Sequence, residues 1–433
     1  MIASLSGIRG VLNKDMSLDD VSRFAVNFGK ATGSKKFLLA RDPRSTGPAI
    51  CKVVTAGLAS LGGTVYDYGI ISTPALFRES RKSGLPAVMV TASHNEPQFN
   101  GLKFLLEGVG VGQDIFDQIV GGLTPRSAPF KHGAVKRGRA PSYVADLVER
   151  FGAGTCEGVR VAVDMGGGAA ISHAVPLLTK LGCDVMSMND SYGVFDRKVD
   201  PVADELELLR RTVKWKGCDI GLGFDCDGDR LVIVDSSGRK RSGDFMLTLA
   251  LSETLKRTGE KKVVVSVDTT RAVDEVAKKA GVQVFRSKVG EANVVGLMKE
   301  RGARLGGEGS SGGLIDGSFN YCRDSMLAAL SIIRALRWEG RRLYESVPVY
   351  QQERVALWLP KEKALKAIRK LAARYEGVDL TDGLKIGLKD RSWVLIRPSG
   401  TEDLVRVSAE APSSEKASRL AKSFTKKVKE LSR

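Results

Sequence analysis

The sequence predicts an α/β protein of four domains, three of which share one supersecondary unit. A chain of 433 residues is too long for a single compact core, because domains usually hold about 100 to 150 residues. Three β-like runs, KFLLARD, VRVAVD and KVVVSVD, end in Asp42, Asp164 and Asp268. A short loop, a helix-like stretch, a Gly and a second apolar run follow each Asp, which is the pattern of layered strands and helices.

The C-terminal segment follows a different pattern. Its strand-like runs SWVLIRP and LVRVSAEAP precede a final helix with apolar residues at helical spacing, so we expect a smaller α+β domain. Loop-rich stretches such as TPRSAPFKHGAVKRGRAPS and WEGRRLYESVP mark boundaries between domains. The predicted domains are residues 1–140, 141–242, 243–345 and 346–433.

Composition and charge favour a cytoplasmic protein that binds anions. Hydrophobic residues make up 42% of the chain, and no apolar run approaches the roughly 18 residues that cross a bilayer. The start, MIASLSGIRG, lacks the apolar region of a signal peptide. The six cysteines form no CxxC pair, which argues against a zinc cluster or a disulfide framework. A net charge of +17 suits phosphorylated ligands and equally suits a nucleic-acid surface.

Three aspartates recur at every second position in GFDCDGDRLVIVD, namely Asp225, Asp227 and Asp229. Carboxylates this close repel one another unless a cation is bound, and their hard oxygen atoms suit Mg²⁺ or Ca²⁺. An EF-hand loop is excluded, because Arg230 stands where that loop needs Gly and Ser236 where it needs Glu. The stretch therefore predicts a metal site, with a solvated acidic turn as the alternative.

The loop VMVTASHNEPQFNG follows a β-like run and is rich in turn-forming residues. It would place Ser93 at the carboxyl edge of a sheet, where α/β proteins build their sites. A hydrolase elbow of the form G-x-S-x-G is excluded, because Thr91 and Asn95 occupy its glycine positions. An ordinary turn remains the alternative.

Two further loops carry polar groups on flexible backbone. In GGEGSSGG, a carboxylate and two hydroxyls could hydrogen-bond a polyol, and a flexible Gly/Ser hinge is the alternative. In RPSGTEDLVR, two arginines flank hydroxyls on a Gly-containing turn, which favours a phosphate cradle over a surface turn.

These four loops, in this order along four successive domains, resemble those of the α-D-phosphohexomutase family, which includes phosphoglucomutase, phosphomannomutase and phosphoglucosamine mutase. The resemblance runs from SGIRG through TASHN, DCDGDR and GEGSSGG to RPSGTE, and it covers almost the whole chain. It implies the four-domain phosphohexomutase architecture, with mixed sheets in the three α/β domains and a smaller α+β domain at the C-terminus.

The resemblance also implies a phosphoryl carrier and a metal ion. Ser93 would carry a phosphoryl group and donate it to a hydroxyl of a sugar monophosphate, and the resulting bisphosphate would turn over and return its other phosphate to Ser93. One Mg²⁺ per active site would be held by Ser93, Asp225, Asp227 and Asp229 and would neutralise charge during transfer. A sugar bisphosphate would act as the activator.

Positive side chains implied by the resemblance surround the same phosphate. Arg9 and Lys103 would line the site, and Arg230 would lie close to the phosphoserine. Either His94 or Lys103 would take the hydroxyl proton. As a base, Lys103 would need a pKa below its usual value of about 10.4.

The two remaining loops would bind the sugar phosphate. Glu308 and Ser310 match the sugar-binding loop, although the longer GEGSSGG sequence leaves Ser311 as an alternative to Ser310. The loop that grips the non-reacting phosphate is matched by Arg397, Ser399, Gly400, Thr401 and Arg406. One departure from the family pattern is Glu96, which follows TASHN where Pro is usual.

The expected function is interconversion of hexose 6-phosphate and hexose 1-phosphate, and the expected partner is a phosphorylated sugar. NGLKFLLEGVG is similar to the phosphoglucosamine mutases, with phosphomannomutase and phosphoglucomutase as alternatives. An alternative from another class is a non-catalytic nucleic-acid-binding or regulatory relative, which the net charge supports, although no aromatic base-stacking platform is evident. We expect no membrane partner and no nucleic acid, and either a monomer or a homodimer.

Overall fold

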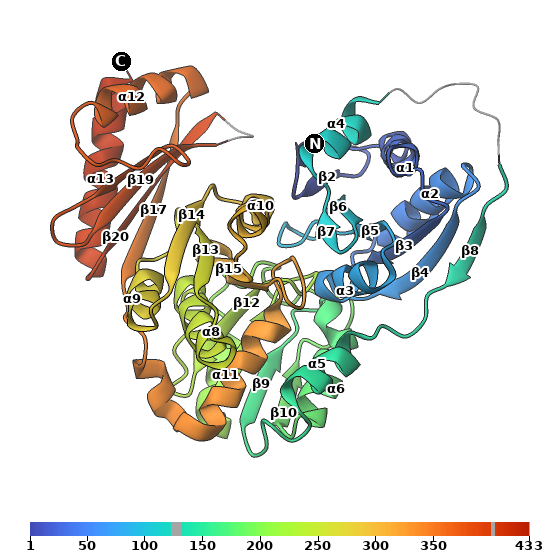
Figure 1. Cartoon of the computed structure of the whole chain (residues 1–433), viewed down its shortest axis with the longest axis horizontal. Coiled ribbons are helices and arrows are strands. Elements are labelled where there is room, and N and C mark those ends of the chain that lie inside the picture. The colour runs from blue at the N-terminus through green and yellow to red at the C-terminus, as the bar shows by residue number, and fades with distance from the viewer. Residues whose placement is uncertain (123–130, 400–402, 433) are drawn as a thin grey trace.

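Four β-sheets, arranged in chain order, form the framework of the protein (Figure 1). The computed structural model describes residues 1–122, 131–399 and 403–432. The first sheet has the order β1-β2-β6-β5-β3-β4-β8, with β7 beside β6. Its strands are β1 (Ile2–Ser4), β2 (Gly7–Val11), β3 (Lys36–Arg41), β4 (Thr64–Ile70), β5 (Ala87–Val90), β6 (Phe99–Leu106), β7 (Val109–Gly110) and β8 (Ala134–Arg137).

Four helices accompany the first sheet. Ser17 and Asp20 form a capping box at the start of the first helix, which satisfies backbone N–H groups that have no partner within the helix. A left-handed Gly33 ends that helix. The helices are α1 (Leu18–Thr32), α2 (Gly47–Ala59), α3 (Thr73–Ser83) and α4 (Gln113–Gly121).

The second and third sheets repeat one topology. Their orders are β10-β9-β11-β12 and β14-β13-β15-β16, and in each the first three strands are parallel and the last is antiparallel. The run β4-β3-β5-β6 of the first sheet has the same directions. The prediction of three related α/β units with mixed sheets is therefore confirmed.

The elements of these two sheets are as follows. The second contains β9 (Arg160–Asp164), β10 (Asp184–Met188), β11 (Ile220–Phe224), β12 (Leu231–Asp235), α5 (Tyr143–Phe151), η1 (Ala169–Ser172), α6 (Ala174–Lys180) and α7 (Glu207–Lys216). The third contains α8 (Gly243–Thr258), β13 (Lys262–Ser266), α9 (Ala272–Lys279), β14 (Gln283–Ser287), α10 (Glu291–Arg301), β15 (Leu305–Glu308), η2 (Gly309–Ser311), β16 (Gly313–Asp316), α11 (Ser325–Glu339) and η3 (Gly340–Glu345).

The C-terminal part is an antiparallel sheet with two helices, which confirms the smaller α+β domain. Its order is β17-β20-β19-β18, and α13 packs on it through an apolar stripe that includes Phe424 and Val428. The elements are β17 (Gln351–Trp358), α12 (Lys361–Ala372), β18 (Leu384–Gly387), β19 (Trp393–Pro398), β20 (Leu404–Ala411) and α13 (Ser414–Leu431).

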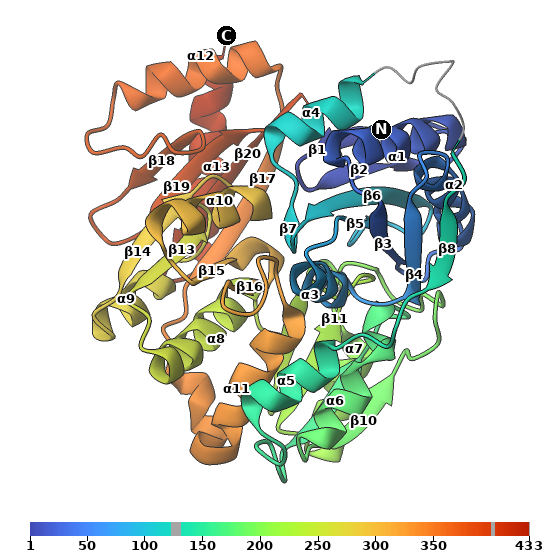
Figure 2. The ribbon, with the colours of Figure 1, turned by 45° about the vertical axis from the view of Figure 1, so that its right-hand side comes forward.

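The apolar core is shared among the first three sheets but not with the fourth. One buried cluster runs from Leu38 on β3 through Val161 on β9 to Val265 on β13. The C-terminal sheet has its own cluster, and in the described ranges a small apolar cluster of Val267, Trp393 and Leu395 joins it to the third sheet. Both ribbon views place this part beside the first sheet and above the two middle ones (Figure 2).

No helix in the described ranges has the length and apolar character needed to cross a bilayer.

Candidate active site

The carboxyl ends of two strands bring Ser93 to the aspartate triad. Ser93 follows β5 and the triad follows β11, and all four side chains are fully buried. The Ser93 hydroxyl donates a hydrogen bond of 3.0 Å to Oδ2 of Asp225. Asp225, Asp227 and Asp229 each offer an oxygen, and these oxygens lie within 4.8 Å of one another. The structure therefore joins two loops that the sequence separates by more than a hundred residues.

Ser93 has a left-handed backbone, with φ of 52°. This conformation is uncommon outside Gly and costs energy of order 1–3 kcal/mol, so the surrounding structure must hold it. The N–H of Ser93 donates to Oγ1 of Thr91 at 2.8 Å, and the Thr91 hydroxyl donates in turn to Asp42 at 2.6 Å. The strained turn presents the Ser93 hydroxyl to the triad.

Arg44 holds the rest of this loop, and no motif in its local sequence predicts this role. Its guanidinium is fully buried, pairs with Asp42 at 3.0 Å, and donates to four main-chain carbonyls of the Ser93 loop. The acceptors are the carbonyl oxygens of Ser93 at 2.8 Å, Asn95 at 2.6 Å, Glu96 at 2.5 Å and Phe99 at 2.9 Å. The only available signal was its place two residues after the Asp that ends a strand.

The donor set of the triad fits a divalent cation. Oδ1 of Asp227 and Oδ1 of Asp229 are buried and have no hydrogen-bond partner among the described residues. Buried carboxylate oxygens without a partner are costly, and oxygen ligands of this kind are those that Mg²⁺ and Ca²⁺ prefer. Burial, followed by the charges of Asp227 and Asp229, raises the pKa of Asp225 well above its ordinary value. A cation at this point would relieve that repulsion.

Lys103 and Thr73 contact the other oxygens of the triad. The Lys103 ammonium lies 2.7 Å from Asp227 and 3.1 Å from Asp229, and the Thr73 hydroxyl donates to Asp227 at 2.6 Å. Burial alone would lower the pKa of Lys103, but these two carboxylates outweigh burial and raise it. In this arrangement Lys103 is a cation that balances the triad, whereas proton abstraction would need a lowered pKa.

His94 lies among cations. Its Nε2 is 3.5 Å from Nη2 of Arg230, and its Nδ1 is buried without a partner in the described ranges. Burial, followed by the charges of Arg230, Arg9 and Arg323, lowers the pKa of His94 to about 2, so the imidazole is neutral. Arg9 donates to Oδ1 of Asn95 at 2.9 Å. The guanidinium groups of Arg9 and Arg230 therefore make this side of Ser93 suitable for binding an anion.

Arg323 connects the aspartate triad to the GGEGSSGG loop, and it is a site residue that no sequence motif predicted. Its nearly buried guanidinium donates to Asp229 at 2.8 Å, to Glu308 at 3.3 Å and to Oγ of Ser311 at 3.2 Å. Glu291 pairs with it at 3.2 Å. Its position just before α11 carries no motif, because its partners come from three other segments.

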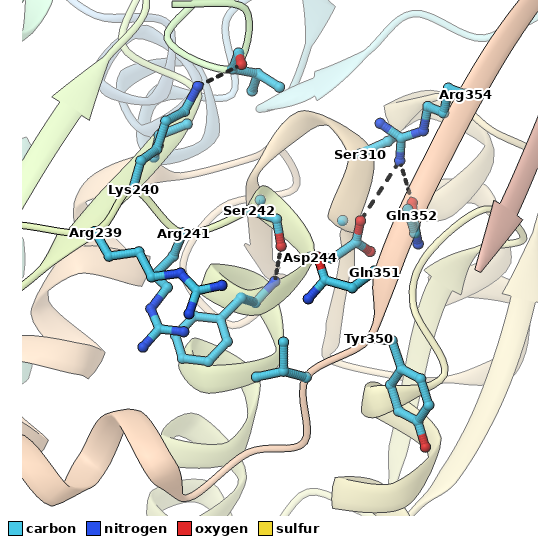
Figure 3. Close-up of a pocket in the computed structure, with 16 residues that line it drawn as sticks. Arg239, Lys240, Arg241, Ser242, Asp244, Ser310, Tyr350, Gln351, Gln352 and Arg354 are labelled. Carbon is cyan, nitrogen blue, oxygen red and sulfur yellow. Dashed lines mark hydrogen bonds and ion pairs between the residues drawn. The ribbon is translucent and has the colours of Figure 1, made fainter. Parts of the chain in front are cut away.

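The GGEGSSGG loop, predicted to bind the sugar, places the Ser311 side chain, rather than that of Ser310, beside Glu308. Glu308 accepts a hydrogen bond of 2.7 Å from the N–H of Gly290, and burial raises its pKa. Ser311 is buried against Arg323. Ser310 makes no side-chain hydrogen bond among the described residues and lines a different cavity (Figure 3). Of the two serines that the sequence left open, Ser311 has the geometry for a shared contact with Glu308.

The predicted phosphate loop lies in the C-terminal domain. Arg397 on β19 and Arg406 on β20 are direct cross-strand partners, so their side chains share one face of the sheet. Arg397 pairs with Asp382 at 3.6 Å, and the N–H of Ser399 donates to the carbonyl of Leu404 at 2.8 Å. The predicted residues Gly400 and Thr401 lie outside the described residues.

The structure brings most of the predicted site together. Ser93, His94, Arg9, Lys103, Arg230 and the triad form one cluster, which Arg323 connects to Glu308. In contrast, Arg397 makes no ion pair or hydrogen bond to this cluster in the described part of the chain. A ligand that contacts both Arg397 and the cluster would have to extend from the C-terminal domain to the domains that carry Ser93 and the triad.

Comparison with known proteins agrees with this arrangement. Models of phosphoglucomutase/phosphomannomutase domains match the chain in order: alpha/beta/alpha domains I, II and III at residues 2–126, 141–238 and 242–352, and the C-terminal domain at residues 355–427.

Curated relatives and solved structures match over nearly the full length. A probable phosphoglucosamine mutase from Methanopyrus kandleri is 33% identical and covers 97% of this chain and 96% of its own. A phosphoglucomutase/phosphomannomutase from Thermococcus kodakarensis is 31% identical, with 95% and 94% covered. The structure of a phosphoglucomutase/phosphomannomutase family protein from Burkholderia thailandensis superimposes with a TM-score of 0.86 at 27% identity, covering 99% of this chain and 98% of that one. The chain therefore belongs to the phosphoglucomutase/phosphomannomutase family of phosphohexomutases, as the four loops of its sequence indicated.

Proposed function

We propose that this chain is a phosphoglucosamine mutase, which interconverts glucosamine 6-phosphate and glucosamine 1-phosphate through a phosphorylated Ser93 and a sugar bisphosphate. The observation that carries the proposal is the buried Ser93 hydroxyl, 3.0 Å from Asp225 and facing the triad. The choice of sugar is supported by the names of relatives about 30–34% identical over nearly the full chain, most of which are probable phosphoglucosamine mutases.

Phosphoryl transfer from Ser93 requires a fixed serine and charge neutralisation. The bond between the Ser93 oxygen and phosphorus breaks while a bond forms from the sugar hydroxyl to phosphorus, and the second transfer runs the same way in reverse. Arg44 fixes the loop through its four carbonyl contacts, so the serine oxygen keeps its place. Arg9 and Arg230 would face the phosphoryl oxygens.

The residues that would hold Mg²⁺ are Ser93, Asp225, Asp227 and Asp229. When bound, the ion supplies charge neutralisation at the transferring phosphate. Lys103 balances the carboxylates from the other side. Of the two side chains proposed to exchange the hydroxyl proton, His94 is neutral and could accept it, whereas Lys103 is held as a cation by Asp227 and Asp229 and could only donate.

Glu308 and Ser311 would bind sugar hydroxyls, and Arg397 with Arg406 would hold the phosphate that does not react. Two orientations of the sugar must fit, because each of its ends reacts in turn. Arg323 hydrogen-bonds to both Glu308 and Asp229, so it would hold Glu308 at a fixed position relative to the triad in both orientations of the sugar.

The test is Mg²⁺-dependent interconversion of 1- and 6-phosphates of glucosamine, mannose and glucose, primed with a sugar bisphosphate. We expect the largest kcat/KM with glucosamine phosphates and loss of nearly all turnover in Ser93→Ala. A higher kcat/KM for mannose or glucose would replace the proposed substrate and keep the mutase chemistry. Full activity of Ser93→Ala would reject the phosphoserine route itself.

A further inference from the structure

A second cavity, of about 460 Å³, lies apart from the Ser93 cluster. Figure 3 shows it between the turn after β12, the start of α8 and the start of β17. Among the residues that line it, Gly309 and Ser310 belong to the predicted GGEGSSGG loop, and neither Ser93 nor the triad takes part. Its volume is in the range of small-molecule sites, which is about 300 to 1,000 Å³.

The lining is strongly basic. Four cationic residues, Arg239, Lys240, Arg241 and Arg354, outnumber the one carboxylate, Asp244. The Lys240 ammonium donates a hydrogen bond of 2.8 Å to the carbonyl of Val202. It therefore stabilises the wall of the cavity and does not point into it. The three arginines supply the cationic groups of the cavity, although two of them also pair with carboxylates, Asp235 and Asp244.

The arginines stand on opposite walls. In Figure 3, Arg239 and Arg241 lie on one side and Arg354 on the other. Arg241 is held in place by an ion pair with Asp235 at 2.6 Å and by stacking on Phe245 at 4.6 Å. On the far wall, Arg354 donates to Oε1 of Gln352 at 2.7 Å and lies 3.7 Å from Asp244.

The remaining walls are polar. Ser242 caps α8 through a hydrogen bond of 3.1 Å from the N–H of Phe245, so the positive end of this 16-residue helix adds to the arginines. The Ser310 hydroxyl and the Gln351 amide lie between the charged walls, and Gln352 lies beside Arg354 (Figure 3). Such groups hydrogen-bond a hydroxylated chain or ring.

We propose that this cavity binds a small hydroxylated ligand with an anionic group at each end, such as a sugar acid phosphate. Guanidinium groups bind phosphate and carboxylate oxygens through paired N–H donors. Because arginines lie on two opposite walls, a ligand that contacts both walls needs an anionic group at each end. The polar middle suits the hydroxyls between them.

A ligand here would couple the C-terminal domain to the sugar loop. Gly309 and Ser310 follow Glu308 directly, while Gln351 to Arg354 begin the C-terminal sheet. A Cβ on Gly309 would come within 1.8 Å of Oδ1 of Asp244, so the loop and the cavity wall are in direct contact. Occupancy would therefore fix β17 against the loop that carries Glu308.

The test is calorimetric titration of the full chain, without Mg²⁺, with 6-phosphogluconate. This probe has a phosphate and a carboxylate at opposite ends and no anomeric carbon for a mutase to phosphorylate. The titration compares wild type with Arg239→Gln/Arg354→Gln, with each single substitution, and with Arg230→Gln beside Ser93. Circular dichroism and turnover with hexose phosphates check that the cavity variants are folded.

Binding in wild type and in Arg230→Gln, weakened about tenfold or more in the double variant and less in each single variant, supports the cavity site. Equal affinity in wild type and the double variant overturns it. Loss of binding in Arg230→Gln also overturns it, because the probe would then occupy the Ser93 cluster. No binding to wild type at millimolar probe overturns it as well. These readouts do not depend on the proposed mutase activity.

Discussion

The fully buried guanidinium of Arg44 donates a hydrogen bond of 2.8 Å to the main-chain carbonyl of Ser93. Three more carbonyls of the same loop share this side chain, so one residue orients the whole turn. A lysine has a single ammonium and cannot reproduce the planar fork of donors.

Arg44→Lys is expected to reduce kcat by about a hundredfold or more, because the Ser93 oxygen loses its fixed position. KM should change little, since the hydrogen bonds of the Arg44 side chain in the described structure go to the loop and to Asp42. Arg41→Lys is the matched control, because among the described residues the Arg41 guanidinium donates to the carbonyl of Asp42 and to no part of the Ser93 loop. Equal kcat values for the two variants would contradict the positioning role.

Binding of Mg²⁺ should stabilise the chain through the triad. At a concentration a hundred times Kd, a ligand that binds only the folded state adds about 2.7 kcal/mol, and calorimetry should show a higher Tm with MgCl₂ than with EDTA. Asp227→Asn removes one ligand of the ion, so the rise in Tm caused by Mg²⁺ should be smaller in this variant than in the wild type. An undiminished Mg²⁺ effect in this variant would place the ion elsewhere.

Ser311 and Ser310 are adjacent but face different surroundings, and this separates their expected roles. Ser311→Ala should raise KM for the sugar phosphate about tenfold, because a shared contact beside Glu308 and Arg323 is lost. Ser310→Ala should leave KM within about twofold and instead weaken binding in the second cavity. Steady-state kinetics of both variants measure these KM values. A larger increase of KM in Ser310→Ala than in Ser311→Ala would show that Ser310 contacts the sugar.

Arg397 and Arg406 are direct cross-strand partners on β19 and β20, so both guanidinium groups lie on one face of the C-terminal sheet. Arg406→Gln should raise KM for the sugar phosphate about tenfold, because one of the two cations proposed to hold the non-reacting phosphate is lost. Steady-state kinetics with hexose phosphates measure this change. An unchanged KM would show that Arg406 does not hold the phosphate.

Asp244 predicts a pH dependence of stability. Burial raises its pKa to about 7 from an ordinary value of 3.8. Because the folded-state pKa is the higher one, folding favours the protonated form. The resulting stability is complete below pH 3.8 and is lost as the pH rises to about 7.

Asp244→Asn keeps an acceptor for the N–H of Thr270 but cannot ionise. Between pH 5 and pH 8, the Tm of the wild type should fall relative to that of Asp244→Asn. The corresponding loss in the free energy of unfolding of the wild type, relative to the variant, should be about a few kcal/mol. Melting curves at both pH values give the comparison. A constant difference in Tm would show that Asp244 does not titrate in this range.

The sequence predicted the parts of the site that local motifs carry. Ser93 and the three aspartates were identified because turn residues and repeated carboxylates are visible within a few positions. Arg44 and Arg323 were not identified, because their partners lie in distant segments and a single arginine carries no local pattern. The pKa of Lys103 also depends on carboxylates from another sheet.

The fold was predictable for a similar reason. Strand, loop and helix succession repeats along the chain, so three related units could be recognised before their sheets were known. The choice between Ser310 and Ser311 could not be made, because it depends on how the short η2 turn rotates adjacent side chains.

The division of the apolar core limits how this molecule can change over evolution. A substitution at Val161 disturbs a cluster to which the first three sheets all contribute, so those sheets must evolve together. The C-terminal sheet meets the rest through little apolar surface, of which Val267 and Trp393 are part, and it can be exchanged or can drift as a separate unit. Core substitutions in the C-terminal sheet are therefore expected to leave the packing around Ser93 unchanged.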